Sequence, residues 1–464
     1  MVRGTSRGPT RSRVAAGLTT CVAVALLAPA ARSDAGERVY VTAAALDVRA
    51  AASAKSPRVG VVRAGGSAAI DATRAASAGD GCATPWVPVA PAGFVCAGEG
   101  TTRDATSPAV RVLARWARGT SGPLPASYGF AIESPLYARV PTKGEQRASE
   151  PGLAALQKKL APEAVDSAPS GEAMPDELRA GAFAPYAPRP VAAGSPVVGV
   201  VSGGAPIGWV GEVDADGRVW LVTPDLLLVP RERVRRAVVS AFHGTEISGA
   251  ARFAIVHGKR RAPYHQEGGA FRAGEPSWAP GTVVTLSDKR VRFGGDVFVE
   301  TTEPGAFLRA SDAIEVTPRA AASYGLGAAE RFVDVDARTH AVLLREGDRV
   351  VYATLGAVGP DTARGKFRVA SKHRTLAAPF DVAVPLGRAR AETPLVVLGA
   401  TAGSDRRIAL EASWWLTNFG ATKGTPGVGL SPLDARRVFD WAAPALPDGW
   451  HSVWGEGAFI VVHD

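Results

Sequence analysis

The chain has 464 residues, a length that allows about three domains. Its formal net charge is +9, and residues 1–35 contain five arginines and one aspartate, so the remainder carries about +5. The basic residues are scattered rather than clustered, which argues against a nucleic-acid-binding surface. A small net positive charge suits contact with an anionic cell envelope, and it is also ordinary for a protein surface.

Residues 1–35 have the pattern of a secretory signal peptide. Four arginines precede an apolar run from Val14 to Ala28, and Ser33-Asp34-Ala35 provides a small-x-small cleavage site. The run is too short and too rich in alanine for a membrane span. Cys21 lies in the middle of that run, which makes a lipid-modified start the less favoured alternative. We therefore expect an exported chain in the periplasm or cell envelope, with no stable membrane span after signal removal.

Residues 36–100 predict a small β module, because short apolar runs alternate with Gly, Pro and Ser turns. Leu46-Asp47-Val48-Arg49, Val59-Gly60-Val61-Val62 and the later Trp86 resemble bacterial SH3-like domains, which often occur beside cell-wall enzymes. Cys82 and Cys96 are the two cysteines that remain after signal removal, so a disulfide is predicted in this exported module. It would stabilise the module by roughly 3 kcal/mol.

Residues 101–194 are predicted to be an irregular connector rich in proline and alanine. Within it, Leu153, Leu156 and Leu160 indicate one amphipathic helix over Glu150–Leu160. Residues 195–326 return to strand-like runs and predict one or two further small barrels. Hairpin turns are expected at Asp214-Ala215-Asp216-Gly217 and Gly294-Gly295-Asp296.

The three histidines of this region, His243, His257 and His265, have no metal-ligand spacing. We expect neither a metal site nor a cofactor.

Residues 327–464 predict a mostly β domain with at least one packed helix. Alternating apolar residues around Val333 and Val342, and the run Val350–Leu355, indicate two strands joined by a turn at Glu346-Gly347-Asp348-Arg349. Lys366–Val369 and Pro394–Leu398 predict further strands. Ser431 is a favourable N-cap before Pro432 in the first helical position. The apolar residues that follow on one helical face are Ala435, Val438, Phe439 and Ala442.

Several segments of this last domain resemble, in the same order, the L,D-transpeptidase (YkuD) catalytic domain. They are 331–359, 362–369, 372–375, Trp415, 418–420, 430–432, 434–437 and 446–450. The resemblance covers roughly the last 135 residues, and Ala363 departs from the proline of the family's Thr-Pro-x-Gly-x-Phe segment. It implies a mainly β chain in which small SH3-like barrels precede a YkuD-like domain that engages peptidoglycan stem peptides or other cell-wall components.

All the catalytic positions of that family are substituted here. The family carries a His-Gly pair followed further along by Ser-His-Gly-Cys. By position, Glu411 and Ala412 stand for the first pair, and the second motif falls on Gly424, Thr425, Pro426 and Gly427. Acyl transfer of this kind needs a thiolate, a histidine that moves protons, and donors for the oxyanion.

A shifted alignment does not restore the thiol, because Cys21, Cys82 and Cys96 all lie far upstream. Losing the nucleophile of a comparable acyl-transfer enzyme lowers turnover about a millionfold. We therefore expect a degenerate site without cysteine-dependent activity.

Substitute residues are Ser413, Thr425 or Ser431 as nucleophile, His373 or His451 as base, and Glu411 as acid or base. None of the serines lies in a Gly-x-Ser-x-Gly turn, so structural roles are favoured, with Ser431 as a helix cap and Glu411 solvated or ion-paired. Trp414, Trp415 and His373 are the candidate ligand-binding residues of this region.

Three functions remain open from the sequence. The favoured one is a peptidoglycan-associated binding or scaffold protein with an inactive transpeptidase-like domain. The others are an active enzyme of the same fold with an unrecognised nucleophile, and a secreted multi-barrel interaction protein with a different ligand.

Overall fold

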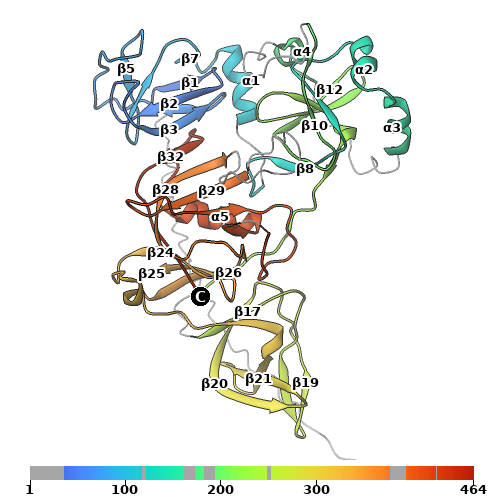
Figure 1. Ribbon diagram of the computed structural model, residues 1–464, viewed down its shortest axis with the longest axis vertical. Coiled ribbons are helices and arrows are strands. Elements are labelled where there is room, and N and C mark those ends of the chain that lie inside the picture. The colour runs from blue at the N-terminus through green and yellow to red at the C-terminus, as the bar shows by residue number, and fades with distance from the viewer. Residues whose placement is uncertain are drawn as a thin grey trace, which may run out of the picture. The chain divides into compact units, whose positions relative to one another are not determined.

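β-Strands dominate the chain, as its turn-punctuated sequence predicts (Figure 1). The computed structural model describes residues 36–117, 122–160, 173–181, 194–247, 252–376, 393–424 and 426–464. The mainly β fold class is confirmed, and the described strands form open sheets with no closed barrel among them. The predicted signal peptide, residues 1–35, lies outside the described residues.

Seven short strands form the amino-terminal module in two sheets. They are β1 (Arg38–Val41), β2 (Ala45–Arg49), β3 (Arg58–Arg63), β4 (Ser67–Ala69), β5 (Trp86–Pro88), β6 (Phe94–Cys96) and β7 (Thr101–Thr102). Its valine core is completed by Trp450 and Val453, which come from the end of the chain. The predicted SH3-like similarity of this module stays a prediction.

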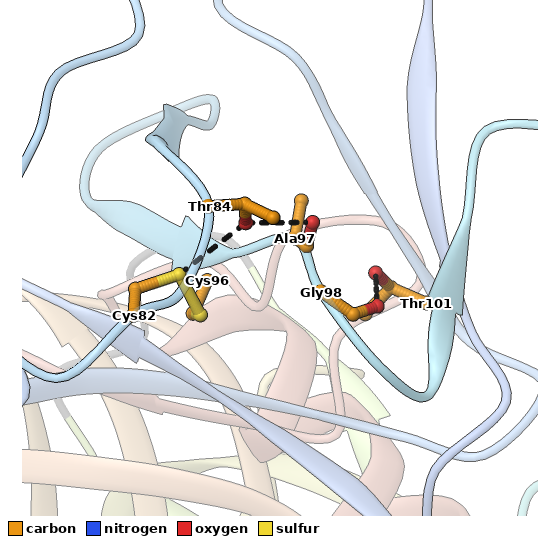
Figure 2. Close-up of a disulfide and its surroundings, with 6 residues drawn as sticks. All are labelled: Cys82, Thr84, Cys96, Ala97, Gly98 and Thr101. Atoms are coloured by element: carbon orange, nitrogen blue, oxygen red, sulfur yellow. Dashed lines mark hydrogen bonds between the residues drawn. A yellow bond between two sulfur atoms is a disulfide. The ribbon is translucent and has the colours of Figure 1, made fainter.

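The predicted disulfide between Cys82 and Cys96 is confirmed (Figure 2). The two Cα atoms are 5.6 Å apart, and 14 positions separate the residues along the chain. Thr84 supports the same turn, because its hydroxyl donates a hydrogen bond of 3.0 Å to the carbonyl of Ala97. The bridge therefore ties the loop after residue 81 to strand β6.

The region predicted as an irregular connector contains regular structure, which corrects that expectation. Strands β8 (Ser127–Ala131) and β9 (Ser134–Tyr137) pair with strands of the following module. The helices are α1 (Pro108–Ala117), α2 (Lys143–Ser149), α3 (Leu153–Leu160) and α4 (Asp176–Ala180). The helix predicted over Glu150–Leu160 is found as α3. The two strands escaped prediction because their partners lie about 60 residues or more further along the chain, beyond the reach of local periodicity.

The partners of β8 and β9 complete two sheets, ordered β10-β9-β14-β13-β12 and β11-β8-β15. Their bounds are β10 (Val197–Val201), β11 (Pro206–Trp209), β12 (Gly211–Ala215), β13 (Arg218–Val222), β14 (Leu228–Pro230), η3 (Arg231–Arg233) and β15 (Val234–Arg236). The predicted hairpin turn joins β12 to β13, with Asp216 and Gly217 at φ 53° and 76°. These left-handed angles suit Asp-Gly.

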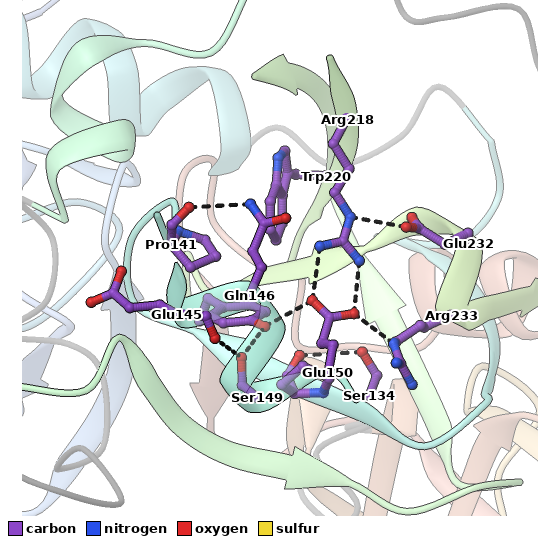
Figure 3. A network of polar contacts seen from close by, with 12 residues as sticks. Ser134, Pro141, Glu145, Gln146, Ser149, Glu150, Arg218, Trp220, Glu232 and Arg233 are labelled. Atoms are coloured by element: carbon purple, nitrogen blue, oxygen red, sulfur yellow. Dashed lines mark hydrogen bonds and ion pairs between the residues drawn. The ribbon is translucent and has the colours of Figure 1, made fainter. Parts of the chain in front are cut away.

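A buried carboxylate holds this module together (Figure 3). Glu150 accepts two hydrogen bonds of 2.8 Å from Arg218 and one of 2.7 Å from Arg233. Tyr137 donates a further hydrogen bond of 2.8 Å, and Glu232 pairs with the outer edge of Arg218. Burial alone would raise the pKa of Glu150, but the hydrogen bonds and charge of Arg218 outweigh it and hold this pKa below its usual value.

The next sheet has the order β19-β18-β22-β21-β20-β17-β23. Its elements are β17 (Phe253–Val256), β18 (Tyr264–Glu267), β19 (Ala270–Ala273), β20 (Val283–Phe293), β21 (Asp296–Thr301), β22 (Ala306–Arg309), η4 (Ala310–Asp312) and β23 (Ala313–Val316). The predicted Gly294-Gly295 turn joins β20 to β21 as a long hairpin (Figure 1). The short strand β16 (Thr245–Glu246) pairs with the carboxy-terminal domain instead, and η5 (Ala321–Tyr324) precedes that domain.

The carboxy-terminal domain is built on the largest sheet. Its strands are β24 (Arg331–Asp336), β25 (Ala341–Glu346), β26 (Arg349–Leu355), β27 (Ala357–Val358), β28 (Gly365–Leu376), β29 (Thr393–Ala400), β30 (Arg407–Ala412), β31 (Val428–Leu430), β32 (Ser452–Trp454) and β33 (Phe459–His463). Strand β32 also pairs with β3, which joins this sheet to the amino-terminal module.

The opening of this domain has three strands where the sequence predicts two. The extra reversal lies between β24 and β25, where the Asp336 carboxylate accepts hydrogen bonds from the backbone N–H groups of Arg338 and Thr339. This Asx-type turn allows a reversal without a glycine, so the glycine signal at Gly347 marked only the second turn. The predicted strands at Lys366–Val369 and Pro394–Leu398 are confirmed as parts of β28 and β29.

Helix α5 (Pro432–Trp441) lies on the sheet against β29, β30 and β31 (Figure 1). Ser431 caps it as predicted, because its side chain accepts a hydrogen bond of 3.1 Å from the Asp434 backbone N–H. The four apolar residues predicted on one face are all buried. Capping and periodicity therefore both agree with the observed helix.

Asp434 anchors the start of α5 from within the core. Its carboxylate accepts hydrogen bonds from the hydroxyls of Tyr352, Thr354 and Ser431 at 2.5, 2.7 and 2.8 Å. The backbone N–H of Gly244 donates a fourth, at 2.9 Å. Burial raises the pKa of Asp434 in spite of these donors. This carboxylate therefore ties the helix to β26 and to the segment before β16.

Candidate functional site

Strands β30 and β31 bring the predicted catalytic region together. They run parallel, and their register places Glu411 opposite Gly429 and Ala412 opposite Leu430. The pairing continues beyond β30, because the Ser413 backbone N–H donates a hydrogen bond of 2.9 Å to the carbonyl of Leu430. Segments far apart in the family motif thus become neighbours across one strand pair.

Glu411 forms a buried ion pair with Lys423. Its Oε1 atom lies 2.7 Å from the Lys423 Nζ atom, and the two side chains are 8% and 4% exposed. Gly429 leaves room for this approach, since a Cβ there would lie 3.4 Å from the Lys423 side chain and 2.3 Å from the Ser413 hydroxyl. Glu411, which the sequence resemblance aligns with the family's first histidine, is therefore one half of a closed salt bridge.

Gly427, which the sequence resemblance aligns with the nucleophilic cysteine, is held by Thr362. The Gly427 N–H donates to the Thr362 hydroxyl at 2.9 Å, and that hydroxyl donates to the Gly427 carbonyl at 3.1 Å. The Gly359 N–H bonds to the same carbonyl at 3.0 Å. Gly427 has φ 93°, a region that side chains with a Cβ rarely adopt. The backbone itself is thus poorly suited to a cysteine.

The other described residues of the second motif, Gly424 and Pro426, have no side-chain group that could act as a nucleophile or a base. Gly424 is exposed, and a Cβ built on it would have no neighbour within 4 Å. Pro426 is partly buried. Thr425, the position of the catalytic histidine, lies outside the described residues, so its structural role stays a prediction.

Ser413 is a substitute nucleophile that the structure describes inside this site. It is 0% exposed, and its hydroxyl has no hydrogen-bond partner among the described residues. Ser431 is occupied as the cap of α5 and by its bond to Asp434. A hydroxyl sealed in this way is out of reach of a substrate carbonyl, so the geometry does not favour attack by Ser413.

The two predicted tryptophans differ in exposure. Trp414 is 1% exposed, and its ring stacks on Tyr128 at 5.1 Å with an interplanar angle of 24°. Phe130 lies beside the same ring at 5.2 Å. Trp415 is 43% exposed and meets Trp414 edge-on at 5.4 Å. Of the two indoles, Trp415 therefore presents a surface that a ligand can reach.

His373 lies on β28 and is 3% exposed. Its ring nitrogens lie 2.9 Å from the hydroxyls of Ser452 and Ser371, and the ring packs edge-on against Trp454. These contacts make His373 part of the packing between β28 and β32. Its predicted role in ligand binding stays a prediction.

Lys423 and Thr362 were missed by sequence reasoning. The opposite charges of Lys423 and Glu411 indicate their pairing only weakly, because most lysine and glutamate side chains are exposed. Thr362 belongs to a segment that resembles the family but was not assigned to the site. The local sequence pattern predicts neither the pair of Lys423 and Glu411 nor the hydrogen bonds between Thr362 and Gly427.

The described residues contain no group of three or more His, Cys, Asp or Glu side chains arranged to hold a metal ion. Nor does any helix in the described ranges have the length and hydrophobicity needed to cross a bilayer. The candidate site is thus a packed strand pair with a closed ion pair, with Gly427 before β31 and the exposed indole of Trp415 after β30.

No protein-family model and no curated protein matches this chain. Among solved structures, an L,D-transpeptidase (Yku) from Stackebrandtia nassauensis is similar at 14% identity over 29% of this chain, with a TM-score of 0.20. An L,D-transpeptidase from Mycobacterium smegmatis is similar at 14% identity over 49% of this chain and 94% of its own, with a TM-score of 0.22. An Enterococcus faecium L,D-transpeptidase is similar at 15% identity over 29% of this chain, with a TM-score of 0.22.

The similarity spans 56% of the Stackebrandtia nassauensis structure and 50% of the Enterococcus faecium one. TM-scores of 0.20 to 0.22 are too low to assign this chain to a family or an activity.

Proposed function

We propose that this chain is an exported, peptidoglycan-associated binding or scaffold protein whose transpeptidase-like domain is not catalytic. The observation that carries the proposal is the buried pair of Glu411 and Lys423, together with glycine at position 427. A thiol nucleophile and a neighbouring histidine are both replaced, and the space between β30 and the following loop holds a salt bridge.

The chemistry of the replacement supports loss of catalysis rather than a change of nucleophile. Glycine has no nucleophilic atom, and Glu411 is engaged by an ammonium group at 2.7 Å. The thiols of Cys82 and Cys96 are consumed in their disulfide. Ser413 is sealed from solvent. Among the described candidates in this region, each group that could start acyl transfer is therefore paired or out of reach.

Export and cell-wall contact have separate support. A disulfide persists in oxidising compartments outside the cytoplasm, which agrees with the signal-like start of the sequence. The ordered motifs between Arg331 and Trp450 resemble a family that acts on peptidoglycan. Trp415 supplies an exposed aromatic face beside the altered site, a surface suited to sugars and short peptides.

Pelleting with isolated sacculi tests the binding part of the proposal. The mature protein is expected to sediment with sacculi, and Trp415→Ala is expected to reduce the bound fraction. Phe293→Ala is the matched control, because Phe293 is 42% exposed and lies on β20, in a different sheet, whereas Trp415 is 43% exposed. Failure of the wild-type protein to sediment would favour an interaction protein with another ligand.

Analysis of muropeptides after incubation tests the catalytic part. We expect no new cross-links and no trimmed stem peptides. Mass spectrometry after incubation with a carbapenem or a tetrapeptide donor should show the unmodified protein mass. A covalent acyl adduct would instead establish the alternative, an active enzyme with an unrecognised nucleophile, and mapping the adduct would identify that residue.

A further inference from the structure

A second candidate site lies away from the transpeptidase-like one. A cavity of about 470 Å³ is lined by the turn between β3 and β4, by the carboxyl half of α1, and by residues near the ends of β28 and before β32. None of its lining residues belongs to the segment from Glu411 to Gly427. Its volume is within the range of about 300 to 1,000 Å³ that small-molecule sites occupy.

Two arginines line this cavity, Arg63 and Arg374. Arg63 already interacts with other residues, so Arg374 is the arginine left to meet a ligand. Its backbone N–H bonds to the carbonyl of His451 at 2.9 Å, which places the residue where β28 passes the amino-terminal module. In the part of the chain that the structure describes, its guanidinium has neither a hydrogen bond nor an ion pair. Burial and the charge of Arg436 lower the pKa of Arg374, and the charges of Asp448 and Asp440 offset only part of this. Such a cation is stabilised by an anion.

Asp448, the acidic residue of the lining, acts on Arg374 through its charge but forms no ion pair with it in the described structure. Asp448 pairs with Arg38 at 3.2 Å, and its side chain is 90% exposed. Two other side chains of the lining, Trp116 and Trp450, have buried indole N–H groups without a partner among the described residues. The unmatched side chains of the described lining, Arg374, Trp116 and Trp450, are therefore all donors.

The rest of the lining indicates what kind of molecule the cavity can hold around the negative group. Much of the lining is aromatic or aliphatic, including Tyr40, Leu113, Val210 and Leu226. Pockets of this kind hold an apolar or neutral body and use a few polar groups to orient it. Among the described residues of the lining, the single guanidinium without a partner, that of Arg374, matches one negative group on the ligand.

We propose that this cavity binds a small monocarboxylate with a neutral body, whose carboxylate pairs with Arg374. Two kinds of molecule combine one carboxylate with a neutral body: an acylated short peptide and an N-acetylated sugar acid. The planar guanidinium can hold both carboxylate oxygens.

Isothermal titration calorimetry of the full mature chain tests this assignment with three probes. N-acetyldiglycine represents the peptide source, N-acetylmuramic acid the sugar acid, and inorganic phosphate a simple anion. We expect at least one carboxylate probe to bind with a Kd below about 1 mM, and phosphate to bind at least about tenfold more weakly. The probe that binds more tightly identifies the source.

Two kinds of variant distinguish the effect of the Arg374 charge from the effect of the cavity volume. Arg374→Gln should weaken binding at least about tenfold, and Arg374→Lys should retain part of it. Ala114→Phe, on the α1 wall, should abolish binding by filling the cavity while keeping the guanidinium. Arg111→Gln is the control, because it removes the same charge from an exposed position of α1 outside the lining and should leave the Kd unchanged.

Three results would overturn the assignment. They are the absence of binding of both carboxylates at about 10 mM, phosphate binding as tight as theirs, and an Arg374→Gln variant with the wild-type Kd. Thermal melts confirm that each variant is folded, and if Ala114→Phe is not, the comparison of the Arg374 variants decides. Since calorimetry uses no sacculi, this proposal and the proposed function can fail separately.

Discussion

The Nζ atom of Lys423 lies 2.7 Å from the Oε1 atom of Glu411, and both side chains are more than nine-tenths buried. A buried ion pair of this kind tolerates loss of both charges far better than loss of one, because a single remaining charge is left unpaired in the core.

Breaking this pair on one side should therefore destabilise the domain strongly. We expect Lys423→Met to lower the free energy of unfolding by about 3 to 5 kcal/mol, measured by urea denaturation. The double variant Glu411→Met with Lys423→Met should recover most of that loss, because two apolar side chains replace the pair.

The exposed pair of Arg436 and Asp440 provides the control for this prediction. Its side chains are 53% and 52% exposed, so Arg436→Gln should change the free energy of unfolding by less than about 1 kcal/mol. A double variant as unstable as the single one would show that the pair is not the source of the effect.

Lys372 should make the stability of the chain depend on pH. Its ammonium group is buried, donates to the Ala442 carbonyl at 2.7 Å and lies 4.5 Å from the Phe439 ring centroid. Burial lowers its pKa from 10.5 to about 8. Between these two values the unfolded chain holds a proton that the folded chain has lost, so stability rises with pH across this window, by about 3 kcal/mol in total.

Urea denaturation at several pH values between 7 and 11 checks this expectation. Lys372→Met removes the titrating group, so the difference between the variant and the wild-type protein isolates its contribution from that of other groups. A difference that stays constant across this range would contradict the assignment of the pH dependence to Lys372.

The neighbouring tryptophans should respond differently to truncation. Trp414→Ala removes a ring buried against Tyr128, and we expect a loss of about 3 to 5 kcal/mol in the free energy of unfolding. Trp415→Ala removes a ring that is 43% exposed and should cost less than about 1 kcal/mol. Thermal or urea denaturation of the two variants, side by side, measures both. Equal losses would mean that Trp415 also has a packing role.

Loss of the bridge between Cys82 and Cys96 should destabilise the amino-terminal module. The 14 positions between the cysteines define a loop whose closure is worth about 3 kcal/mol in the chain-entropy account. Denaturation of the variant with both Cys82→Ser and Cys96→Ser, compared with the reduced and oxidised wild-type protein, measures this value. Reduction should mimic the double variant, and a reduced protein as stable as the oxidised one would contradict the prediction.

Several features could be predicted from the sequence because they depend on neighbouring residues alone. The turn at Asp216-Gly217 and the cap at Ser431 follow from side chains that favour a particular local backbone conformation. The disulfide follows from the small number of cysteines in a chain with a signal-like start. The absence of a thiol in the last domain is likewise a property of the sequence alone, and it carries the expectation of an inactive site.

The tertiary structure decided which distant residues meet. Burial of Glu411 depends on Lys423 reaching it across a loop, and burial of Trp414 depends on Tyr128, which belongs to a strand nearly 300 residues earlier in the chain. These long-range contacts decide whether a charge is solvated or paired, and whether an indole is accessible. Local periodicity does not encode them. The sequence therefore determined that the last domain has no thiol, and only the packing decided that Lys423 pairs with Glu411.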